Sequence, residues 1–181
     1  GEAAYYIETI AEGIEFLHRR GIIHRDFKPS NVLLNEAQEP YLADFGIAKV
    51  QEGAVDLTGE RTVGTPFYMA PEMWHGGTTL DQTVDIYAMG VALFQMLAGR
   101  LPYKGEIANV MYAHLHKPVP DVRDANLDLP GSIQRVIHTA MAKSPEHRYQ
   151  SARVMAEALN HAIAQPEGPC LLYTSPSPRD R

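Results

Sequence analysis

Two carboxylates, an amide and a lysine lie close together in one part of the chain. Asp26 is followed by Lys28 and then by Asn31, and Asp44 comes thirteen residues after that asparagine. An acid can accept a proton from a hydroxyl group, and carboxylate and amide oxygens bind Mg²⁺. A lysine beside them can stabilise the charge on a moving phosphoryl group. The set therefore favours phosphoryl transfer from a metal-bound nucleotide.

Three sequence blocks contain or follow these residues. Residues 24–31 read His-Arg-Asp-Phe-Lys-Pro-Ser-Asn, residues 44–46 read Asp-Phe-Gly, and residues 64–72 read Gly-Thr-Pro-Phe-Tyr-Met-Ala-Pro-Glu. Each block alone is more often a turn or a solvated cluster than a catalytic site. Together, at these spacings, they resemble the C-terminal lobe of a eukaryotic-type serine/threonine protein kinase. The amino-acid sequences of the motifs are most similar to those of bacterial members of this family.

The resemblance implies a role for each of the chemical residues. Asp26 would be the catalytic acid that orients the substrate hydroxyl and accepts its proton, and Lys28 would stabilise charge at the γ-phosphate of ATP. Asn31 and Asp44 would hold the magnesium ions, and Leu33 would pack beneath the adenine ring. The implied cofactors are ATP and Mg²⁺, with Mn²⁺ as an alternative metal.

The resemblance also implies that the substrates are proteins. A lysine two residues after the acid is the serine/threonine pattern, and Thr65 would hydrogen-bond both the acid and the lysine. Residues 64–72 would form a shelf for the peptide that carries the Ser or Thr hydroxyl. Autophosphorylation is expected, whereas no sequence preference can be read from these residues.

A regulatory switch is a further hypothesis. Arg25 immediately precedes the catalytic acid, and residues 47–63 are polar and aperiodic, as in a mobile loop. A phosphate on Thr58 or Thr62 would pair with Arg25 and order this loop. The alternative is that both threonines are ordinary loop hydroxyls.

Structural roles are implied for His24, Phe45, Gly46, Glu72, Asp85 and Arg148. Glu72 and Arg148 would form a buried ion pair under the substrate segment, the alternative being two exposed charges. Asp85 would anchor the backbone of the catalytic loop. His24 and Phe45 would stack in the hydrophobic spine of the active state.

Periodicity predicts the elements that position these residues. Apolar side chains at three- and four-residue steps predict a helix over residues 2–20, with Gly21 as its left-handed cap. Residues 32–34 and 41–43 predict a hairpin that brings the two acidic sites together. Residues 81–98 are apolar nearly all round, which predicts a buried helix. Further helices are expected over residues 106–116, 132–142 and 151–164, with Ser132 and Ser151 as N-caps.

These elements and the resemblance together predict an α+β, mainly helical fold, a protein-kinase-like C-terminal lobe with small β-hairpins. We expect residues 1–164 to be a partial kinase domain and residues 165–181 to be a linker and a disordered, non-native tail. Residues 170–181 resemble translated sequencing-adapter sequence, with a natural Ser/Pro-rich linker as the alternative.

The family's N-terminal lobe, with its Gly-rich loop, lysine and glutamate, cannot be found in the sequence. We therefore expect a fragment whose partner is that lobe and which transfers phosphoryl groups poorly alone. The resemblance implies a cytoplasmic kinase domain, and membrane attachment would come only through parts of the parent protein outside this chain.

Composition excludes several other classes of protein. The 181 residues carry 16 Lys and Arg against 22 Asp and Glu, a net charge of −6, with no basic block for nucleic acid. A single cysteine, Cys170, excludes an internal disulfide framework. The strongest apolar stretch, residues 86–98, is too short to span a membrane.

Two other functions stay open at this point. A small-molecule kinase of the aminoglycoside or choline type shares the acid, the asparagine and the second aspartate, but generally lacks the Ala-Pro-Glu segment. A pseudokinase scaffold would be indicated by loss of Asp26, Asn31 or Asp44, and all three are present. A lysine lost from the missing lobe would still leave that reading open.

Overall fold

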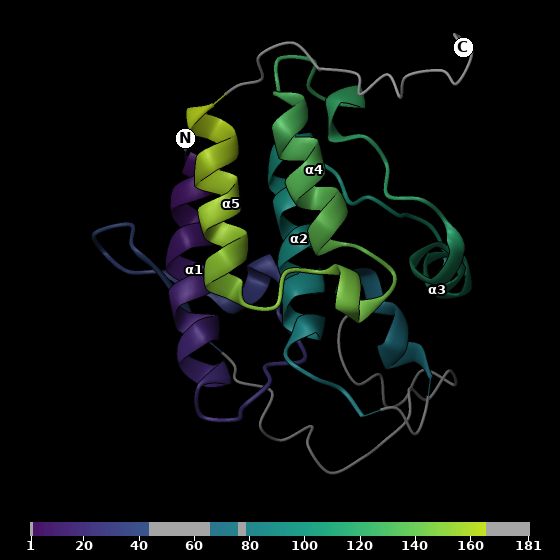
Figure 1. Ribbon diagram of the computed structural model, residues 1–181, viewed down its shortest axis with the longest axis horizontal. Coiled ribbons are helices and arrows are strands. Elements are labelled where there is room, and N and C mark those ends of the chain that lie inside the picture. The colour runs from purple at the N-terminus through teal and green to yellow at the C-terminus, as the bar shows by residue number, and fades with distance from the viewer. Residues whose placement is uncertain (1, 44–65, 76–78, 166–181) are drawn as a thin grey trace, which may run out of the picture.

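The computed structural model describes residues 2–43, 66–75 and 79–165 of the chain. Figure 1 shows α1, α5, α2 and α4 gathered side by side, with α3 set apart from them and a short hairpin beyond α1. The helices in these ranges are α1 (Glu2–His18), α2 (Thr83–Ala98), α3 (Ile107–His116), α4 (Gly131–Ala140) and α5 (Ala152–Ala164). The strands are β1 (Val32–Leu34) and β2 (Pro40–Leu42).

Short 3₁₀ turns lie between these elements. They are η1 (Pro29–Asn31), η3 (Pro66–Tyr68), η4 (Pro71–Trp74), η5 (Val122–Asp124) and η6 (Pro145–His147). All but η5 begin with proline, whose fixed φ angle suits the first helical position and whose missing N–H would have no partner there. The turns η1, η3 and η4 carry the residues that the sequence motifs single out.

Helix α1 buries the stripe that its periodicity predicts. Ile7, Ile10 and Ile14 are almost completely inaccessible, and α1 lies against α5 along this face. The helix ends at His18, two residues before the predicted end, and Gly21 adopts the expected left-handed conformation, with φ at +71°. Leaving α1, the chain passes directly into the segment that carries Asp26.

Helix α2 is the buried centre of the described part. Residues 83–94 are all buried, and α2 contacts α1, α4 and α5. Gly99 ends the helix in the left-handed conformation, with φ at +65°. At Gly90 a Cβ atom would lie 2.8 Å from the Cβ of Ala140, so the absence of a side chain lets α2 and α4 approach closely.

The hairpin forms almost where the two short apolar runs predict it. Its strands are antiparallel, with Val32 opposite Leu42. The second strand covers residues 40–42, one residue earlier than predicted, because the loop closes tightly through a bond from the Glu39 N–H to Asn35 Oδ1 (2.9 Å). Leu33 and Tyr41 are both about half exposed.

One of the two predicted N-caps is wrong. Ser151 caps α5, since its Oγ accepts a hydrogen bond from the N–H of Val154 at 3.2 Å. Ser132 lies inside α4 instead, and the cap position belongs to Pro130. The buried hydroxyl of Ser132 donates a hydrogen bond to the carbonyl of Ala162 at 2.9 Å and so joins α4 to α5.

Helices dominate the described residues and the hairpin is small, which confirms the predicted α+β, mainly helical class. No helix in the described part of the chain combines the length and the apolar character that crossing a membrane requires.

Candidate active site

The loop between α1 and η1 is fixed by the carboxylate of Asp85, in the first turn of α2. Its Oδ2 accepts a hydrogen bond from the His24 N–H at 2.9 Å, and its Oδ1 accepts one from the Arg25 N–H at 2.8 Å. The Nε2 of His18, at the end of α1, lies 2.7 Å from the same Oδ2. Asp85 is 1% exposed, so these bonds form away from water, where charge-assisted bonds are strong. Asp85 thus ties the backbone of this loop to α2.

Arg25 occupies the left-handed region of backbone space, with φ at +63°. Such a conformation costs an L-residue about 1–2 kcal/mol. The bonds from the His24 and Arg25 amides to Asp85 hold the backbone there, directly before Asp26. Strain of this kind is concentrated at functional sites.

Three of the predicted chemical residues meet directly after this turn. The Nζ of Lys28 lies 3.8 Å from Oδ2 of Asp26, and the side-chain amide of Asn31 donates to the Asp26 carbonyl at 2.9 Å. Asn31 is 6% exposed and belongs to the η1 turn. Because its nitrogen is used by Asp26, its amide oxygen is the atom left for a cation. Its backbone carbonyl accepts the Ala43 N–H at 2.8 Å, which ties the end of the hairpin to this site.

Leu33, on β1, is 45% exposed and contributes an open apolar surface beside the loop. Six of the predicted positions lie outside the described residues, and they are Asp44, Phe45, Gly46, Thr58, Thr62 and Thr65. Among the described residues no cluster of three or more His, Cys, Asp or Glu side chains could hold a metal ion.

The side chain of His24 is buried. It is 1% exposed, and its ring meets that of Phe27 edge-on, with centroids 6.3 Å apart. Burial lowers the pKa of His24, and the nearby carboxylates of Asp85 and Asp26 oppose this effect. The predicted contact with Phe45 falls outside the described residues.

The catalytic loop also borders the segment that follows η3. A small cavity of about 10 Å³ is lined on one side by Asp26 and Phe27 and on the other by Tyr68 and Met69. Residues that are about forty positions apart in the sequence therefore face each other here. This places the η3 segment next to the acid, where the resemblance puts the substrate peptide.

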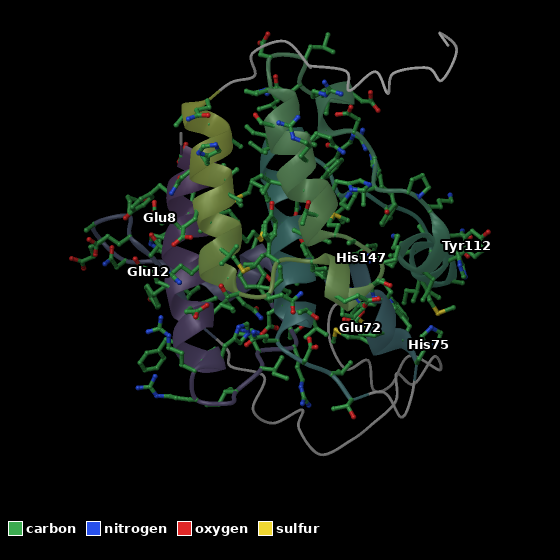
Figure 2. All side chains as sticks on the ribbon, in the orientation of Figure 1. Glu8, Glu12, Glu72, His75, Tyr112 and His147 are labelled. Carbon is green, nitrogen blue, oxygen red and sulfur yellow. The ribbon has the colours of Figure 1, made fainter. Side chains whose placement is uncertain are left out.

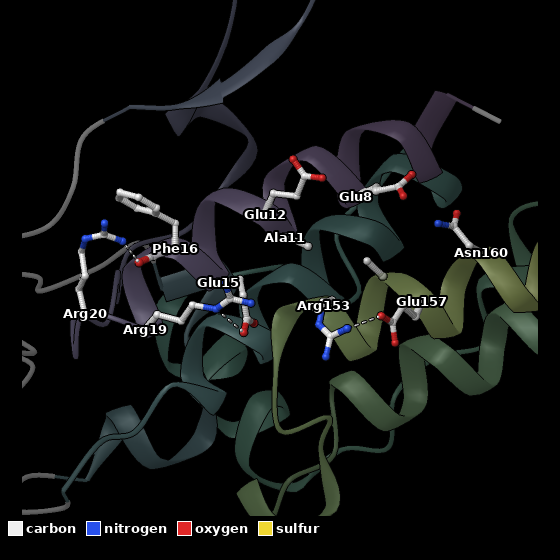
Figure 3. A pocket seen from close by; sticks show the side chains of 11 residues that line it. Glu8, Ala11, Glu12, Glu15, Phe16, Arg19, Arg20, Arg153, Glu157 and Asn160 are labelled. Carbon is white, nitrogen blue, oxygen red and sulfur yellow. Dashed lines mark hydrogen bonds and ion pairs between the residues drawn. The ribbon is translucent and has the colours of Figure 1, made fainter.

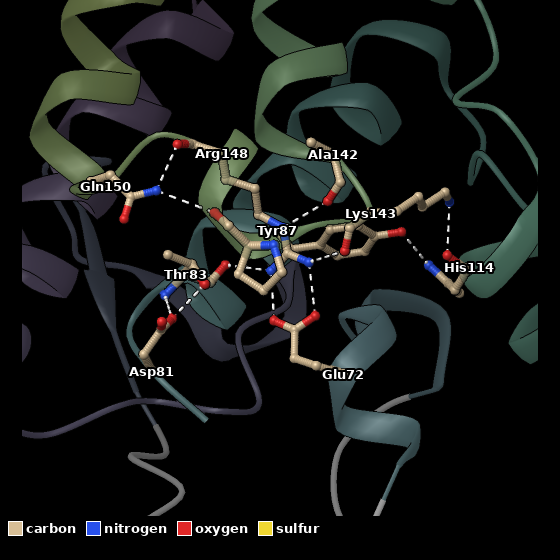
Figure 4. Close-up of polar contacts among 10 residues, drawn as sticks. Glu72, Asp81, Thr83, Tyr87, His114, Ala142, Lys143, Arg148 and Gln150 are labelled. Atoms are coloured by element: carbon tan, nitrogen blue, oxygen red, sulfur yellow. Dashed lines mark hydrogen bonds and ion pairs between the residues drawn. The ribbon is translucent and has the colours of Figure 1, made fainter. Parts of the chain in front are cut away.

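Glu72 and Arg148 form the buried ion pair predicted from the sequence. Nη1 and Nη2 of the arginine lie 2.6 and 2.7 Å from the two carboxylate oxygens (Figure 4). The guanidinium also donates to the carbonyls of Thr83, Ala142 and Lys143. It lies over the ring of Tyr87, 4.9 Å from the centroid. The pair thus fixes η4, the end of the substrate segment, to α2 and η6.

The sequence reasoning missed a second buried polar cluster beside this pair. The hydroxyl of Tyr87 and Nδ1 of His114 are 2.8 Å apart, and Nε2 of His114 lies 3.1 Å from the carbonyl oxygen of Phe67. Lys143 Nζ donates to the His114 carbonyl at 2.7 Å. One signal was available in the sequence, because His114 follows Val110 by four residues and so shares its face of the predicted helix; both side chains are buried.

A larger groove, of about 620 Å³, lies elsewhere, between α1 and α5 (Figure 3). Charged side chains line it, and several of them pair locally, such as Arg19 with Glu15 and Arg153 with Glu157. Glu8 and Glu12 project from the outer side of α1 (Figure 2). None of the catalytic-loop residues 24–31 lines this groove, so we assign the chemistry to the smaller site at Asp26.

Comparisons with known proteins agree with this arrangement. The family model described as the protein kinase domain matches residues 1–162. The DNA damage-responsive serine/threonine-protein kinase RqkA of Deinococcus radiodurans is 38% identical over 148 residues, which cover 81% of this chain and 22% of RqkA. The serine/threonine-protein kinase PrkC of Bacillus subtilis is 36% identical over 163 residues, covering 90% of this chain and 25% of PrkC.

Among solved structures, a double mutant of the Mycobacterium tuberculosis PknI kinase domain matches with a TM-score of 0.67 and 27% sequence identity. The match covers 90% of this chain and 55% of that domain. The chain spans about a quarter of the length of the two curated relatives.

Proposed function

Since this chain belongs to the protein kinase family, we propose that the full-length protein transfers the γ-phosphoryl group of ATP to serine and threonine hydroxyls of proteins. One observation carries the proposal: Asp26, Lys28 and Asn31 meet on a loop whose backbone Asp85 holds from α2. The two relatives named above are serine/threonine kinases by name. Their names and the family membership favour this function over a small-molecule kinase.

The proposed chemistry follows from the positions of the side chains. Asp26 orients the substrate hydroxyl and accepts its proton as the oxygen bonds to the γ-phosphorus and the bond to ADP breaks. Lys28, 3.8 Å from the Asp26 carboxylate, stabilises the charge on the moving phosphoryl group. Asn31 Oδ1 and Asp44 would hold Mg²⁺, which neutralises the phosphate oxygens when it is bound.

Protein substrates are favoured by the second half of the site. Residues 66–72 lie against the catalytic loop and are fixed at Glu72 by Arg148. A firmly held backbone segment beside the acid suits an extended peptide better than a small free molecule. Autophosphorylation belongs to the same proposal, and Thr65 would complete the contacts to Asp26 and Lys28.

We propose the switch at Arg25 on a specific feature of its side chain. Its Nε is buried and has no hydrogen-bond partner among the described residues. A phosphate on Thr58 or Thr62 would supply such a partner. It would order the chain between the proposed metal ligand Asp44 and the proposed substrate segment, residues 66–72.

Parts outside this chain complete the proposed enzyme. An N-terminal lobe with a Gly-rich loop and a lysine would cover Leu33 and the ATP phosphates. The kinase domain would be cytoplasmic, and any membrane attachment would lie in other parts of the protein. Residues 165–181 remain a proposed linker and non-native tail.

The test is phosphoryl transfer from radiolabelled ATP to a basic protein substrate, with the full-length protein. Asp26→Asn should reduce transfer by about 10²–10⁴-fold, because the amide cannot accept the proton. Asp121→Asn is a matched control, since that exposed carboxylate pairs only locally with Arg123 and should leave activity unchanged. Equal activity of Asp26→Asn and the unsubstituted protein would overturn the proposal, and transfer to aminoglycosides or choline alone would replace it.

A further inference from the structure

The cluster at His114 joins three elements that are far apart in the sequence. His114 lies in α3, Tyr87 in α2, and the Phe67 carbonyl in η3, within the proposed substrate segment. Figure 4 shows Tyr87 between Arg148 on one side and His114 on the other. The segment over residues 66–72 is therefore held at Glu72 by one buried group and at Phe67 by another.

The contacts fix the tautomer of His114. A carbonyl oxygen can only accept a hydrogen bond, so Nε2, 3.1 Å from the oxygen of Phe67, must carry the proton. Nδ1 is then the acceptor for the Tyr87 hydroxyl at 2.8 Å. Burial raises the pKa of Tyr87 well above its usual value, so the hydroxyl keeps the proton that it donates.

The ring is held in this state by its surroundings. It meets the ring of Tyr103 edge-on with centroids 4.9 Å apart, and it is 0% exposed. Lys143 Nζ donates to the carbonyls of Ala113 and His114 at the end of α3. Burial, followed by the charge of Lys143, lowers the pKa of His114 to about 4, which keeps the ring neutral near pH 7.

We propose that His114 is a positioning residue for protein substrates: its Nε2–H fixes the backbone of Phe67 and so sets the place of the peptide-binding segment relative to Asp26. The inference rests on the proposed kinase function. A second bond joins the same segment to α2. The hydroxyl of Tyr68, in η3, donates to the side chain of Gln95, in α2, at 2.5 Å, but this bond holds a side chain and not the backbone. The bond from His114 thus fixes the backbone at Phe67, as the Arg148 pair fixes the other end of the segment at Glu72.

The experiment compares two substitutions of His114 in the full-length protein. His114→Leu removes the donor, and we expect the KM for a basic protein substrate to rise about tenfold, with kcat and the KM for ATP within about twofold of their original values. His114→Gln keeps an N–H donor near the Nε2 position, and it should restore a KM within about twofold of the original.

Ser132→Ala is the matched control. It also removes one buried side-chain bond to a backbone carbonyl, but it does so between α4 and α5, remote from the substrate segment. An effect of general destabilisation on KM would appear in both His114→Leu and Ser132→Ala, whereas a positioning effect on KM appears only in His114→Leu. An unchanged KM in His114→Leu, or an equal rise in KM in Ser132→Ala or His114→Gln, would overturn the inference.

Hydrogen–deuterium exchange of residues 66–75 gives a readout that does not depend on activity. Exchange should accelerate in His114→Leu and stay near the original rate in His114→Gln and Ser132→Ala. If the unsubstituted protein transfers no phosphate, the proposed function fails whatever the exchange shows. If it is active and exchange does not change in His114→Leu, only the inference about His114 fails.

Discussion

The side chain of Arg148 illustrates how a buried charge is accommodated in this protein. Its side chain is completely inaccessible, and the guanidinium donors reach both oxygens of Glu72 and three backbone carbonyls. Every direction in which the planar fork can donate is thus occupied. The charge is stable in the interior only while this full set of acceptors remains, so a change at any one acceptor should be felt strongly.

Substituting Glu72→Gln tests this dependence. Removing the carboxylate leaves a buried guanidinium without its counter-charge, and we expect the free energy of unfolding to fall by about 3–5 kcal/mol. Urea denaturation of the full-length protein measures the change. Glu157→Gln is the control, because its pair with Arg153 is exposed and should contribute only about 0.3–0.5 kcal/mol. Similar losses in the two variants would contradict the prediction.

His114 also predicts a pH dependence of stability. Its pKa is about 4 when folded against an ordinary value of 6.5, so the folded ring stays neutral while the unfolded ring takes up a proton as the pH falls. The stabilisation is complete above pH 6.5 and is lost between that pH and 4, by about 3 kcal/mol. Urea denaturation at pH 7 and pH 4 measures this loss.

His114→Gln separates this effect from the titration of carboxylates. The glutamine does not titrate, so its stability should fall about 3 kcal/mol less than that of the original protein over the same interval. Parallel losses in the two proteins would show that His114 is not buried as the neutral form.

At the scale of the elements, the sequence predicted the helices and the hairpin because their patterns are local. The stripe of Ile7, Ile10 and Ile14 and the glycines after α1 and α2 act within one or two turns, and the observed boundaries differ by only one or two residues. Ser132 was misread as a cap because Pro130 takes that position. Its partner carbonyl belongs to α5, which no local pattern reveals.

The candidate active site could be predicted where its residues lie close together in the sequence or belong to the family's motifs. Asp26, Lys28 and Asn31 lie close together in the sequence, and the family resemblance supplied Asp85 and the Glu72–Arg148 pair. The contact of His114 with the carbonyl of Phe67 was missed, because a backbone carbonyl has no sequence signature. The prediction for Asp44 stays a prediction, since that residue lies outside the described part.

The crossing of α2 and α4 gives a prediction at the same scale. In Gly90→Ala the new methyl group would meet Ala140 Cβ at 2.8 Å and Met141 Cγ at 2.9 Å, so the helices must separate at a cost of about 1–3 kcal/mol, which works against a gain in helix propensity of about 1 kcal/mol. Thermal unfolding measures the loss. In the control Gly13→Ala, the methyl group meets the end of the Leu42 side chain, which can rotate away, and the gain in helix propensity of about 1 kcal/mol offsets the contact. A stable Gly90→Ala protein would show that the helices are not in close contact.

For the whole molecule, the apolar surface of the hairpin is the most consequential exposed feature. Leu33, Leu34 and Tyr41 are each 43–50% exposed, and the cross-strand partners Leu33 and Tyr41 share one face of the hairpin. Large apolar side chains gathered and exposed on one short hairpin favour association with a partner. Without such a cover, we expect copies of this chain to associate through the hairpin.

The 181-residue chain alone should therefore self-associate, and Leu33→Gln with Leu34→Gln should reduce the association. Sedimentation velocity measures the distribution of species at several concentrations. Leu127→Gln is the control, because Leu127 is 88% exposed as a single side chain and should not drive association. A monomeric original chain would contradict the prediction.

The pairing of α1 with α5 has a consequence for biosynthesis. Helix α1 is translated well before α5, against which it packs, so its apolar stripe has no final partner until Ala164 has been translated. At typical elongation rates this interval is on the order of 10 s. During that time the nascent α1 is a natural binding site for chaperones at the exit tunnel, and slower translation of the α5 codons would lengthen its exposure.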